Sequence, residues 1–212
     1  KKGDIYFPGS SDFMEKAKKL DAVFPETEKI VVYLVPAIVV QKGNPKSISS
    51  LKDLLKPGLK TILANPKEVC LGLYSVEIIE KNLDKEEIDT FRKNIANYTE
   101  SCEKTSTAIT LKMADATIGW RVFKYWAPKD IDIFTLKDDE IHRIGYIPIA
   151  ISKFTKNKAL AHKFIDFITS YEAKQIFKKH SYFTTPEDAY KFIGKKVPIG
   201  GEYNLPQEWV LQ

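Results

Sequence analysis

Short apolar runs alternate with amphipathic segments along most of this chain. The runs at Thr61–Ala64 and Ala116–Trp120 have the length of buried strands, whereas the segment after Gly72 repeats apolar residues every three or four positions, as a helix does. Strands and helices that follow one another at this spacing predict an α/β fold, with mostly parallel sheets flanked by helices.

The charge pattern argues against a nucleic-acid partner, and the length of the apolar runs argues against a membrane-spanning segment. The net charge is +5, from 33 basic and 28 acidic residues, and the basic residues are scattered rather than gathered into one block. A nucleic-acid-binding surface concentrates its charge on one element, so no nucleic acid is expected. The longest apolar run, Ile30–Val40, contains Pro36 and is far shorter than the roughly 20 residues that span a bilayer.

The sequence contains no recognisable catalytic constellation. His142, His162 and His180 stand apart from any cysteine or acidic pattern, and His162 and His180 fit the surface of amphipathic helices. The nucleophile elbow, the P-loop and the dinucleotide-binding glycine motif do not occur. We therefore predict a protein that is not an enzyme and that needs no cofactor or bare metal cation.

The two cysteines, Cys70 and Cys102, are too few for a disulfide scaffold and lack the paired spacing of a metal site. One disulfide, two thiols or a pair of ligands are all consistent with this count.

Two helix starts in the middle third of the chain carry the strongest functional signal. One lies at Cys70–Leu71–Gly72 and the other at Cys102–Glu103–Lys104. The first N–H groups of a helix have no partner within it, and they can bind an anion. In an open α/β sheet such helix starts converge at the carboxyl ends of the strands. The alternative is that both are ordinary helix caps.

Several blocks resemble, in order, those of periplasmic molybdate-binding proteins, the receptors of molybdate ABC transporters. NPKEVCLGLYSVEIIEKN is similar to that family's D-P-x-x-x-P-A-G-x-Y-A-x-E-x-L, and SISSLKDLLKPGLKTILANP to its S-L-x-D-L-x-K-P-G-V-K-I-A-I-A-D-P. GDIYFPGSSDFMEKA, ADATIGWRVFKY and IGYIPIAIS match further blocks, so the likeness covers about residues 3 to 183.

The resemblance implies a two-lobed type II periplasmic-binding-protein fold, with a hinge of two crossing strands and an oxyanion between the lobes. Lobe I would be residues 1–41 plus 147–212, and lobe II residues 42–146. The implied function is capture of a tetrahedral oxyanion, molybdate or tungstate, for import by an ABC permease. The implied location is the periplasm or the outer face of the cell membrane, with membrane association only through the permease or a lipid anchor.

The resemblance also implies the ligand groups. Leu71 stands where the family offers an amide N–H, and the helix start near Lys104 offers a second, while Ser10 and Ser11 border the cleft from lobe I. The implied ligand-binding set is Ser10, Ser11, Cys70, Leu71, Gly72, Glu103, Lys104, Arg121, Val122 and Tyr125.

Three departures from the family pattern stand out. The family's tyrosine ligand falls on Val122, with Arg121 beside it and Tyr125 one turn on, so a charged donor would replace a neutral hydroxyl. Cys70 replaces the family's proline, and Cys102 lies at the other anion loop. A disulfide between these two loops, two thiols, or a site for a thiophilic species are the alternatives. The block that carries the family's two serine ligands precedes GDIYF and is not in this sequence, so we expect either an incomplete sequence or a different lobe I.

Two other functions fit the same fold. The chain could be a ligand-sensing input domain that signals instead of delivering its ligand. It could also be a receptor for another anion, such as phosphate, a sulfonate or arsenite.

Overall fold

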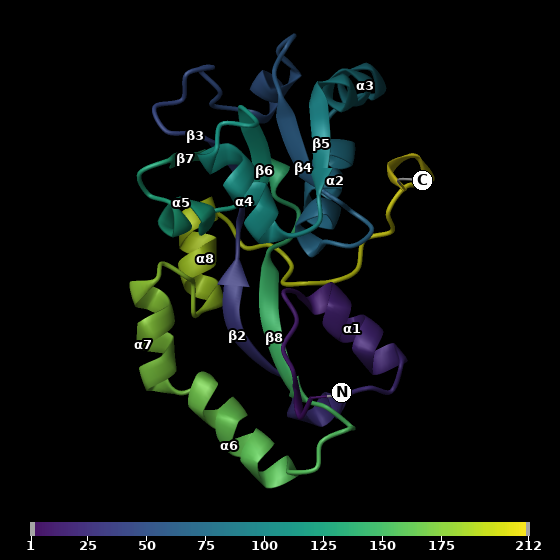
Figure 1. Ribbon diagram of the computed structural model, residues 1–212, viewed down its shortest axis with the longest axis vertical. Coiled ribbons are helices and arrows are strands. Elements are labelled where there is room, and N and C mark those ends of the chain that lie inside the picture. The colour runs from purple at the N-terminus through teal and green to yellow at the C-terminus, as the bar shows by residue number, and fades with distance from the viewer. Residues whose placement is uncertain (1–2, 211–212) are drawn as a thin grey trace. The chain divides into compact units, whose positions relative to one another are not determined.

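The computed structural model describes residues 3–210, which form two compact units (Figure 1). Unit 1 comprises the described residues up to Leu34, Arg143–Phe192 and Lys196–Glu202. Unit 2 comprises Val35–His142, Ile193–Lys195 and the described residues from Tyr203 onward.

These boundaries differ from the predicted lobes of 1–41 plus 147–212 and of 42–146. Residues 36–41 belong to unit 2, because they form a strand that pairs with two other strands of that unit. Arg143 and Ile144 belong to unit 1, where they precede a strand that begins at Gly145. The two crossing hinge strands stay a prediction.

Unit 2 is built on a five-stranded sheet with the order β5-β4-β6-β3-β7. Its strands are β3 (Pro36–Gln41), β4 (Thr61–Ala64), β5 (Ile95–Thr99), β6 (Ala116–Trp120) and β7 (Ile131–Phe134). Every residue of β4 and β6 is buried, as expected for strands with helices on both faces. The predicted bounds of these two strands are confirmed, whereas β5 was not predicted.

The α/β class is confirmed, but the sheets are less parallel than predicted. Within unit 2, β4 pairs in parallel with β5 and with β6, whereas β3 runs antiparallel to β6 and to β7. Parallel pairing needs a crossover connection, and the helices between β4, β5 and β6 supply it. The expectation of mostly parallel sheets is therefore wrong outside these three strands.

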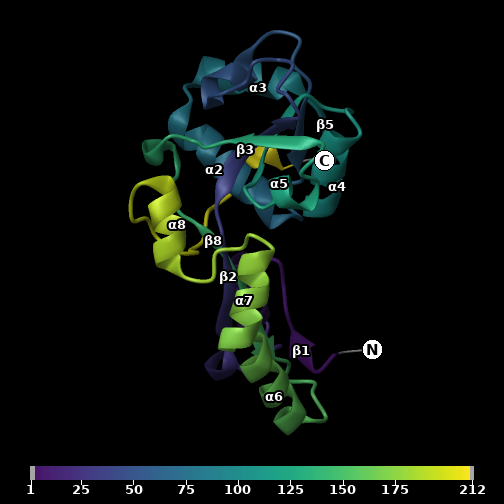
Figure 2. The same cartoon turned by 90° about the vertical axis from the view of Figure 1, so that its left-hand side faces the viewer.

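Helices cover both faces of the unit 2 sheet. In Figures 1 and 2, α2 and α4 lie on opposite sides of the sheet. The helices of this unit are α2 (Cys70–Asn82), α3 (Lys85–Asn94), α4 (Cys102–Thr110) and α5 (Phe123–Trp126), with 3-10 turns at Leu51–Leu55, Asp138–Glu140 and Gln207–Trp209. Capping boxes start two of these elements, at Ser50 with Asp53 and at Asp84 with Glu87.

Unit 1 contains an antiparallel sheet with the order β1-β8-β2. Its elements are β1 (Ile5–Tyr6), α1 (Ser11–Lys19), a 3-10 turn (Pro25–Thr27), β2 (Lys29–Leu34), β8 (Gly145–Ile151), α6 (Lys158–Ile168), α7 (Tyr171–Lys179) and α8 (Pro186–Ile193, of which Ile193 belongs to unit 2). Successive side chains of a strand point to opposite faces. Ile149 and Ile151 accordingly pack with α6, and Ala150 between them packs with α1.

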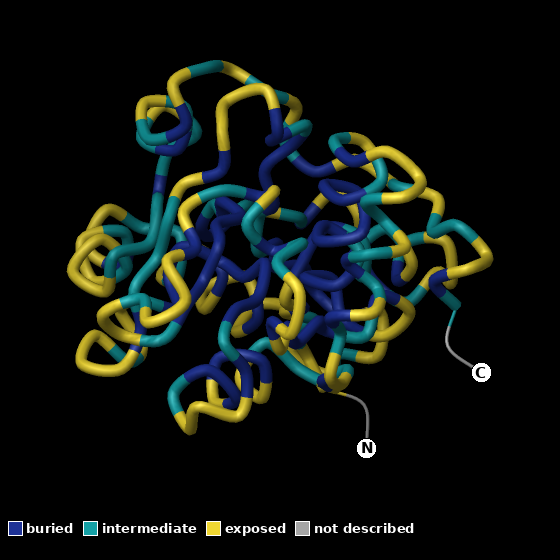
Figure 3. The backbone as a smooth tube through the Cα atoms, turned by 90° about the horizontal axis from the view of Figure 1, so that it is seen from above, coloured by how far each residue is buried: buried dark blue, intermediate teal, exposed yellow. Residues whose placement is uncertain are grey.

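The burial of the backbone follows this architecture. Buried residues follow the strands, and exposed residues follow the loops and outer helix turns (Figure 3). None of the helices within residues 3–210 has the length and apolar character that a bilayer crossing requires.

Candidate anion-binding site

The carboxyl ends of three strands of unit 2 lie at one edge of its sheet. Because β4 is parallel to both β5 and β6, the segments that leave these strands emerge at the same edge. They lead into α2, α4 and α5, so the N-termini of these helices converge there. This is the edge at which open α/β sheets bind ligands.

Gly72 fixes where α2 begins. A Cβ atom on this residue would lie 2.2 Å from the Ala64 carbonyl oxygen and 2.7 Å from the Pro66 Cα and nitrogen. All three neighbours are backbone atoms and cannot turn aside, so only glycine lets the helix approach the end of β4 this closely. The approach sets the position of Leu71, which directly precedes Gly72.

The first turn of α2 has no side-chain cap. Its N-cap residue, Val69, carries no polar side chain, and the first turn contains no acidic residue. The amides of Gly72 and Leu73 bond back to the Val69 carbonyl at 3.0 and 3.4 Å. The Leu71 amide instead donates to the sulfur of Cys102 at the start of α4. This amide is therefore directed toward the other helix start, and its part in anion binding stays a prediction.

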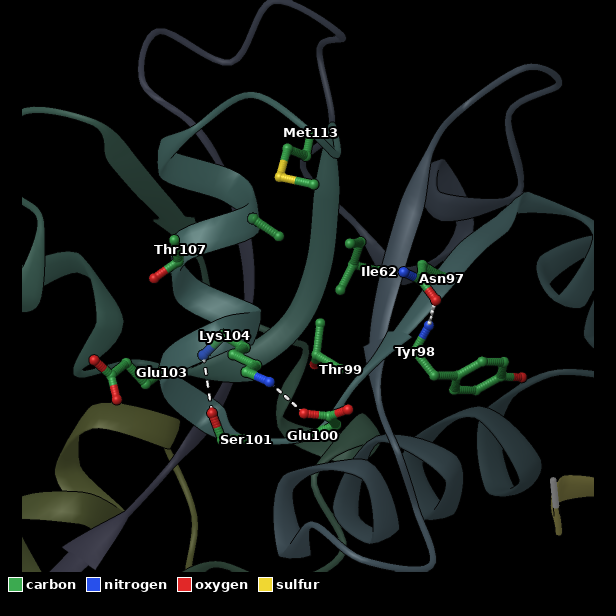
Figure 4. Close-up of a pocket in the computed structure, with 11 residues that line it drawn as sticks. Ile62, Asn97, Tyr98, Thr99, Glu100, Ser101, Glu103, Lys104, Thr107 and Met113 are labelled. Carbon is green, nitrogen blue, oxygen red and sulfur yellow. Dashed lines mark hydrogen bonds and ion pairs between the residues drawn. The ribbon is translucent and has the colours of Figure 1, made fainter.

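The start of α4 is capped, which corrects the prediction for Lys104. The Lys104 amide donates to the Ser101 hydroxyl at 3.0 Å, and its ammonium group pairs with the Glu100 carboxylate (Figure 4). The expectation that the Lys104 amide is open to an anion is therefore wrong, because Ser101 was not recognised as the N-cap.

Cys70 and Cys102 lie together at the two helix starts. Both are in the thiol form, and their side chains form a hydrogen bond. That bond from Cys70 is the largest cause that lowers the pKa of Cys102 below its ordinary value. Burial opposes it, and Trp120 and the Leu71 amide add to the lowering. The two thiols are thus brought together as the resemblance implied, whereas the disulfide stays a prediction.

Arg121 follows β6 directly and is only 8% exposed. Its Nη1 donates to the Tyr125 hydroxyl at 3.2 Å, and its guanidinium carbon lies 5.1 Å from the centre of the same ring. Burial lowers the pKa of Arg121 below its ordinary value, and Tyr125 opposes the shift. Val122 is buried and has no polar side chain, and its carbonyl accepts the Tyr125 amide at 2.9 Å. The structure therefore gives this edge a guanidinium and a phenol.

A pocket of about 510 Å³ lies along one flank of α4 (Figure 4). It contains the predicted residues Glu103 and Lys104, but its lining includes neither Leu71 nor Arg121. The residues that line it are Ile62, Asn97, Tyr98, Thr99, Glu100, Ser101, Glu103, Lys104, Thr107, Ala108 and Met113. The pocket therefore includes part of the α4 start but neither Leu71 nor Arg121.

Ser10 and Ser11 belong to unit 1, where they open α1. Both are buried, and Ser10 occupies the N-cap position without capping the helix through its side chain. Among the described residues, the Ser11 hydroxyl has no hydrogen-bond partner. A buried hydroxyl of this kind is uncommon, so Ser11 is a reasonable ligand candidate.

Asp12 and Arg143 accompany these serines. Arg143 Nη1 lies 3.5 Å from Asp12 Oδ1 and donates to the Gly201 carbonyl at 2.6 Å. Burial raises the pKa of Asp12 above its ordinary value, and Arg143 opposes the shift. This neighbouring carboxylate distinguishes the unit 1 group from the start of α2, whose first turn contains no acidic residue.

The histidine, cysteine and acidic side chains were also compared as possible ligands of a bare cation. No three histidine, cysteine or acidic side chains in that range come together as metal ligands. His162 and His180 are exposed, and His142 is half-buried with its Nε2 3.3 Å from Asn82 Oδ1.

Comparison with known proteins gives one family. Residues 1–183 match the profile of the family described as bacterial extracellular solute-binding protein. A sulfate-binding protein of Salmonella typhimurium is 25% identical over 169 residues, which are 71% of this chain and 50% of that protein. The chain thus spans about half the length of the curated relatives it matches.

Two solved structures share the fold. The periplasmic molybdate-binding protein of Azotobacter vinelandii has a TM-score of 0.72 and 15% identity, covering 86% of this chain and 78% of that one. PEB3 with bound L-phospholactate has a TM-score of 0.73 and 22% identity, covering 87% and 81%; PEB3 is from Campylobacter jejuni. The family and these structural neighbours are binding proteins rather than enzymes.

Proposed function

Because the chain belongs to the bacterial extracellular solute-binding protein family, we propose that it captures a small tetrahedral oxyanion for import by an ABC transporter. Molybdate or tungstate is the first candidate, and sulfate is the principal competitor. One observation carries the proposal: the Leu71 amide lies at an uncapped helix start, directed toward a second helix start at the carboxyl edge of the sheet.

The chemistry of this edge suits an oxyanion. Helix N-termini provide N–H donors and a partial positive charge without any countercharge that would have to be desolvated. Sulfur is a weak hydrogen-bond acceptor, so an anionic oxygen can take the Leu71 amide from Cys102 with a net gain. Arg121 adds one full positive charge at the same edge, and this helps to offset the cost of burying a dianion.

The choice among tetrahedral anions rests on similarity. The blocks around Gly72 resemble molybdate-binding receptors, and a molybdate-binding protein shares the fold. A sulfate-binding relative supports sulfate instead. We place molybdate and tungstate first because the motif that resembles their receptors is the one that builds the α2 start.

A phosphorylated carboxylic acid is the second candidate, and Arg121 favours it. A buried guanidinium can bind a carboxylate or phosphate with two parallel hydrogen bonds, which the neutral hydroxyl expected from the resemblance cannot. PEB3, which shares the fold, was solved with L-phospholactate.

The remaining parts of the proposal concern location and partners. The family is extracellular, and we place this chain in the periplasm or at the outer face of the membrane. Delivery to an ABC permease follows from the proposed function. Ser10 and Ser11 form a separate group of candidate donors in unit 1, and their part in anion binding stays a prediction.

Thermal unfolding with and without ligand tests the proposal. An anion at 100 times its dissociation constant stabilises the folded protein by about 2.7 kcal/mol. For a chain of this size that corresponds to a rise in midpoint of roughly 5 to 11 °C. The ligands to compare are molybdate, tungstate, sulfate, phosphate, arsenite and phospholactate, each with and without reductant. If no anion raises the midpoint and a neutral solute does, the proposal is wrong.

A pair of variants at Leu71 tests the donor itself. Leu71→Pro removes the N–H within the first helical turn, where proline is tolerated, and Leu71→Ala keeps the N–H while losing the same packing. A hydrogen bond to a charged group contributes about 1.5–3 kcal/mol, so Leu71→Pro should weaken anion binding roughly 10- to 150-fold relative to Leu71→Ala. Equal dissociation constants for the two folded variants would contradict the assignment.

A further inference from the structure

The contact between Cys70 and Cys102 joins two elements that the sheet holds in place. Cys70 is the first residue of α2 and Cys102 the first residue of α4, and these helices lie on opposite faces of the same sheet (Figure 2). Their N-termini meet at the carboxyl edge of the sheet. The two sulfurs are therefore brought together by the crossover topology of β4, β5 and β6 and by the Gly72 approach, not by a flexible loop.

The two thiols are not equivalent. Cys70 is 6% exposed, whereas Cys102 is only partly buried. The Cys102 sulfur accepts hydrogen bonds from the Cys70 side chain, the Leu71 amide and the Trp120 side chain. Donors of this kind, at a helix N-terminus, stabilise the thiolate, and the pKa of Cys102 is accordingly lowered.

We propose that Cys70 and Cys102 form a reactive dithiol that exchanges with small-molecule disulfides, with Cys102 as the attacking sulfur and Cys70 as the resolving sulfur. This assignment goes beyond anion capture and needs no bound anion. The extracellular setting of the family is one in which disulfides form and persist.

The exchange proceeds in two balanced steps. The Cys102 thiolate attacks one sulfur of a disulfide RSSR, which forms a mixed disulfide and releases RS⁻. Cys70 then loses its proton to the released RS⁻ and attacks the Cys102 sulfur, which expels the second RS⁻, and this takes up a proton from water. Counted from the Cys102 thiolate, the protein gives up two electrons and one proton, water supplies the second proton, and the small molecule is reduced to two thiols.

The product is a disulfide that joins the first turns of α2 and α4. The Cys102 sulfur in that bond is neutral and a poor acceptor, so it no longer competes for the Leu71 amide. The dithiol is thus placed where its redox state changes the donor set of the helix starts.

The test uses the full chain, reduced and freed of reductant, with oxidised glutathione as the probe. The wild type should lose both thiols and gain no glutathione, and peptide mapping should find Cys70 linked to Cys102. Cys70→Ser should stop at one glutathione on Cys102. Cys102→Ser should react with glutathione on the order of tenfold more slowly than Cys70→Ser, because the buried Cys70 lacks the donors of Cys102. Circular dichroism of each variant confirms that it is folded.

Three results would overturn the proposal. One is a wild type that keeps glutathione on either cysteine without closing the bond. Another is equal rates for the two folded single variants. The third is a wild type that reacts only in denaturant, which would show that the folded protein protects both sulfurs.

Discussion

We predict that replacing Gly72 with alanine destabilises the protein, which is the opposite of the usual effect of this change. A glycine-to-alanine change at a compatible position stabilises a protein by about 0.4–1 kcal/mol. At Gly72 the new Cβ would lie 2.2 Å from the Ala64 carbonyl oxygen, where normal contact is well over an ångström longer. Overpacking against atoms that cannot move aside costs about 1–3 kcal/mol, and a backbone clash belongs at the upper end of that range. We therefore expect a net loss of stability.

The loss should appear as a midpoint lowered by roughly 2 to 12 °C, since 1 kcal/mol shifts the midpoint of a domain this large by about 2–4 °C. Circular dichroism melts of wild type, Gly72→Ala and Gly9→Ala measure it. Gly9 is the matched control because a Cβ there would meet nothing within 4 Å. Anion binding should weaken as well, because α2 must shift away from β4 and carry the Leu71 amide with it. A Gly72→Ala protein as stable as wild type would refute the close approach on which the site depends.

Three further predictions follow from individual contacts. Burial lowers the pKa of His142 below its ordinary value of 6.5. As the pH falls, the unfolded chain therefore binds a proton at His142 before the folded protein does, and the free energy of unfolding decreases below pH 6.5. His142→Gln should reduce the change in unfolding midpoint between pH 7.5 and 5, whereas His162→Gln, at an exposed position, should not. Trp209 is fully buried, donates a hydrogen bond to Glu80, and has the Arg92 guanidinium carbon 5.1 Å from the centre of its ring. Trp209→Ala should therefore lower the free energy of unfolding in urea by about 3–5 kcal/mol. Trp126→Ala, at a 45% exposed position, should lower it much less. If the dithiol controls the Leu71 amide, the oxidised protein should bind the anion more tightly than the reduced one in calorimetric titration, and Cys70→Ser should abolish that difference.

The sequence predicted the centre of unit 2 well because its signals there are local. Apolar runs bounded by turn residues gave β4 and β6 at their observed bounds, Thr61–Ala64 and Ala116–Trp120. The helix that follows β4 was likewise expected at Cys70–Leu71–Gly72, where α2 begins. Each of these signals depends only on neighbouring residues.

The missed features depend on distant contacts. β5 reads Ile-Ala-Asn-Tyr-Thr, which contains residues that strands disfavour, and it forms because it lies beside β4 at the edge of the sheet. The β3 direction was missed for a similar reason, since antiparallel pairing with β6 is set by the fold and leaves no mark in the strand's own residues. Lys104 was assigned as a donor because Ser101 was not read as a cap, although a serine three residues before an amide is a recognisable local signal.

The Leu71 amide at the start of α2 can donate its hydrogen bond either to the Cys102 sulfur or to a bound anion. A buried N–H without a partner costs about 1–3 kcal/mol, so an acceptor for the Leu71 amide stabilises the reduced protein when no anion is bound. The Cys102 sulfur supplies one, and as a weak acceptor it gives up the amide more readily than a carboxylate or a hydroxyl would. A carboxylate in its place would repel an anion, and an alanine would leave the donor unpaired. A thiol satisfies the amide without excluding the oxyanion, and a second thiol within bonding reach lets oxidation withdraw that sulfur. Cys70 and Cys102 can therefore supply an acceptor for the Leu71 amide when no anion is bound, and their redox state can determine whether that amide is available to an anion.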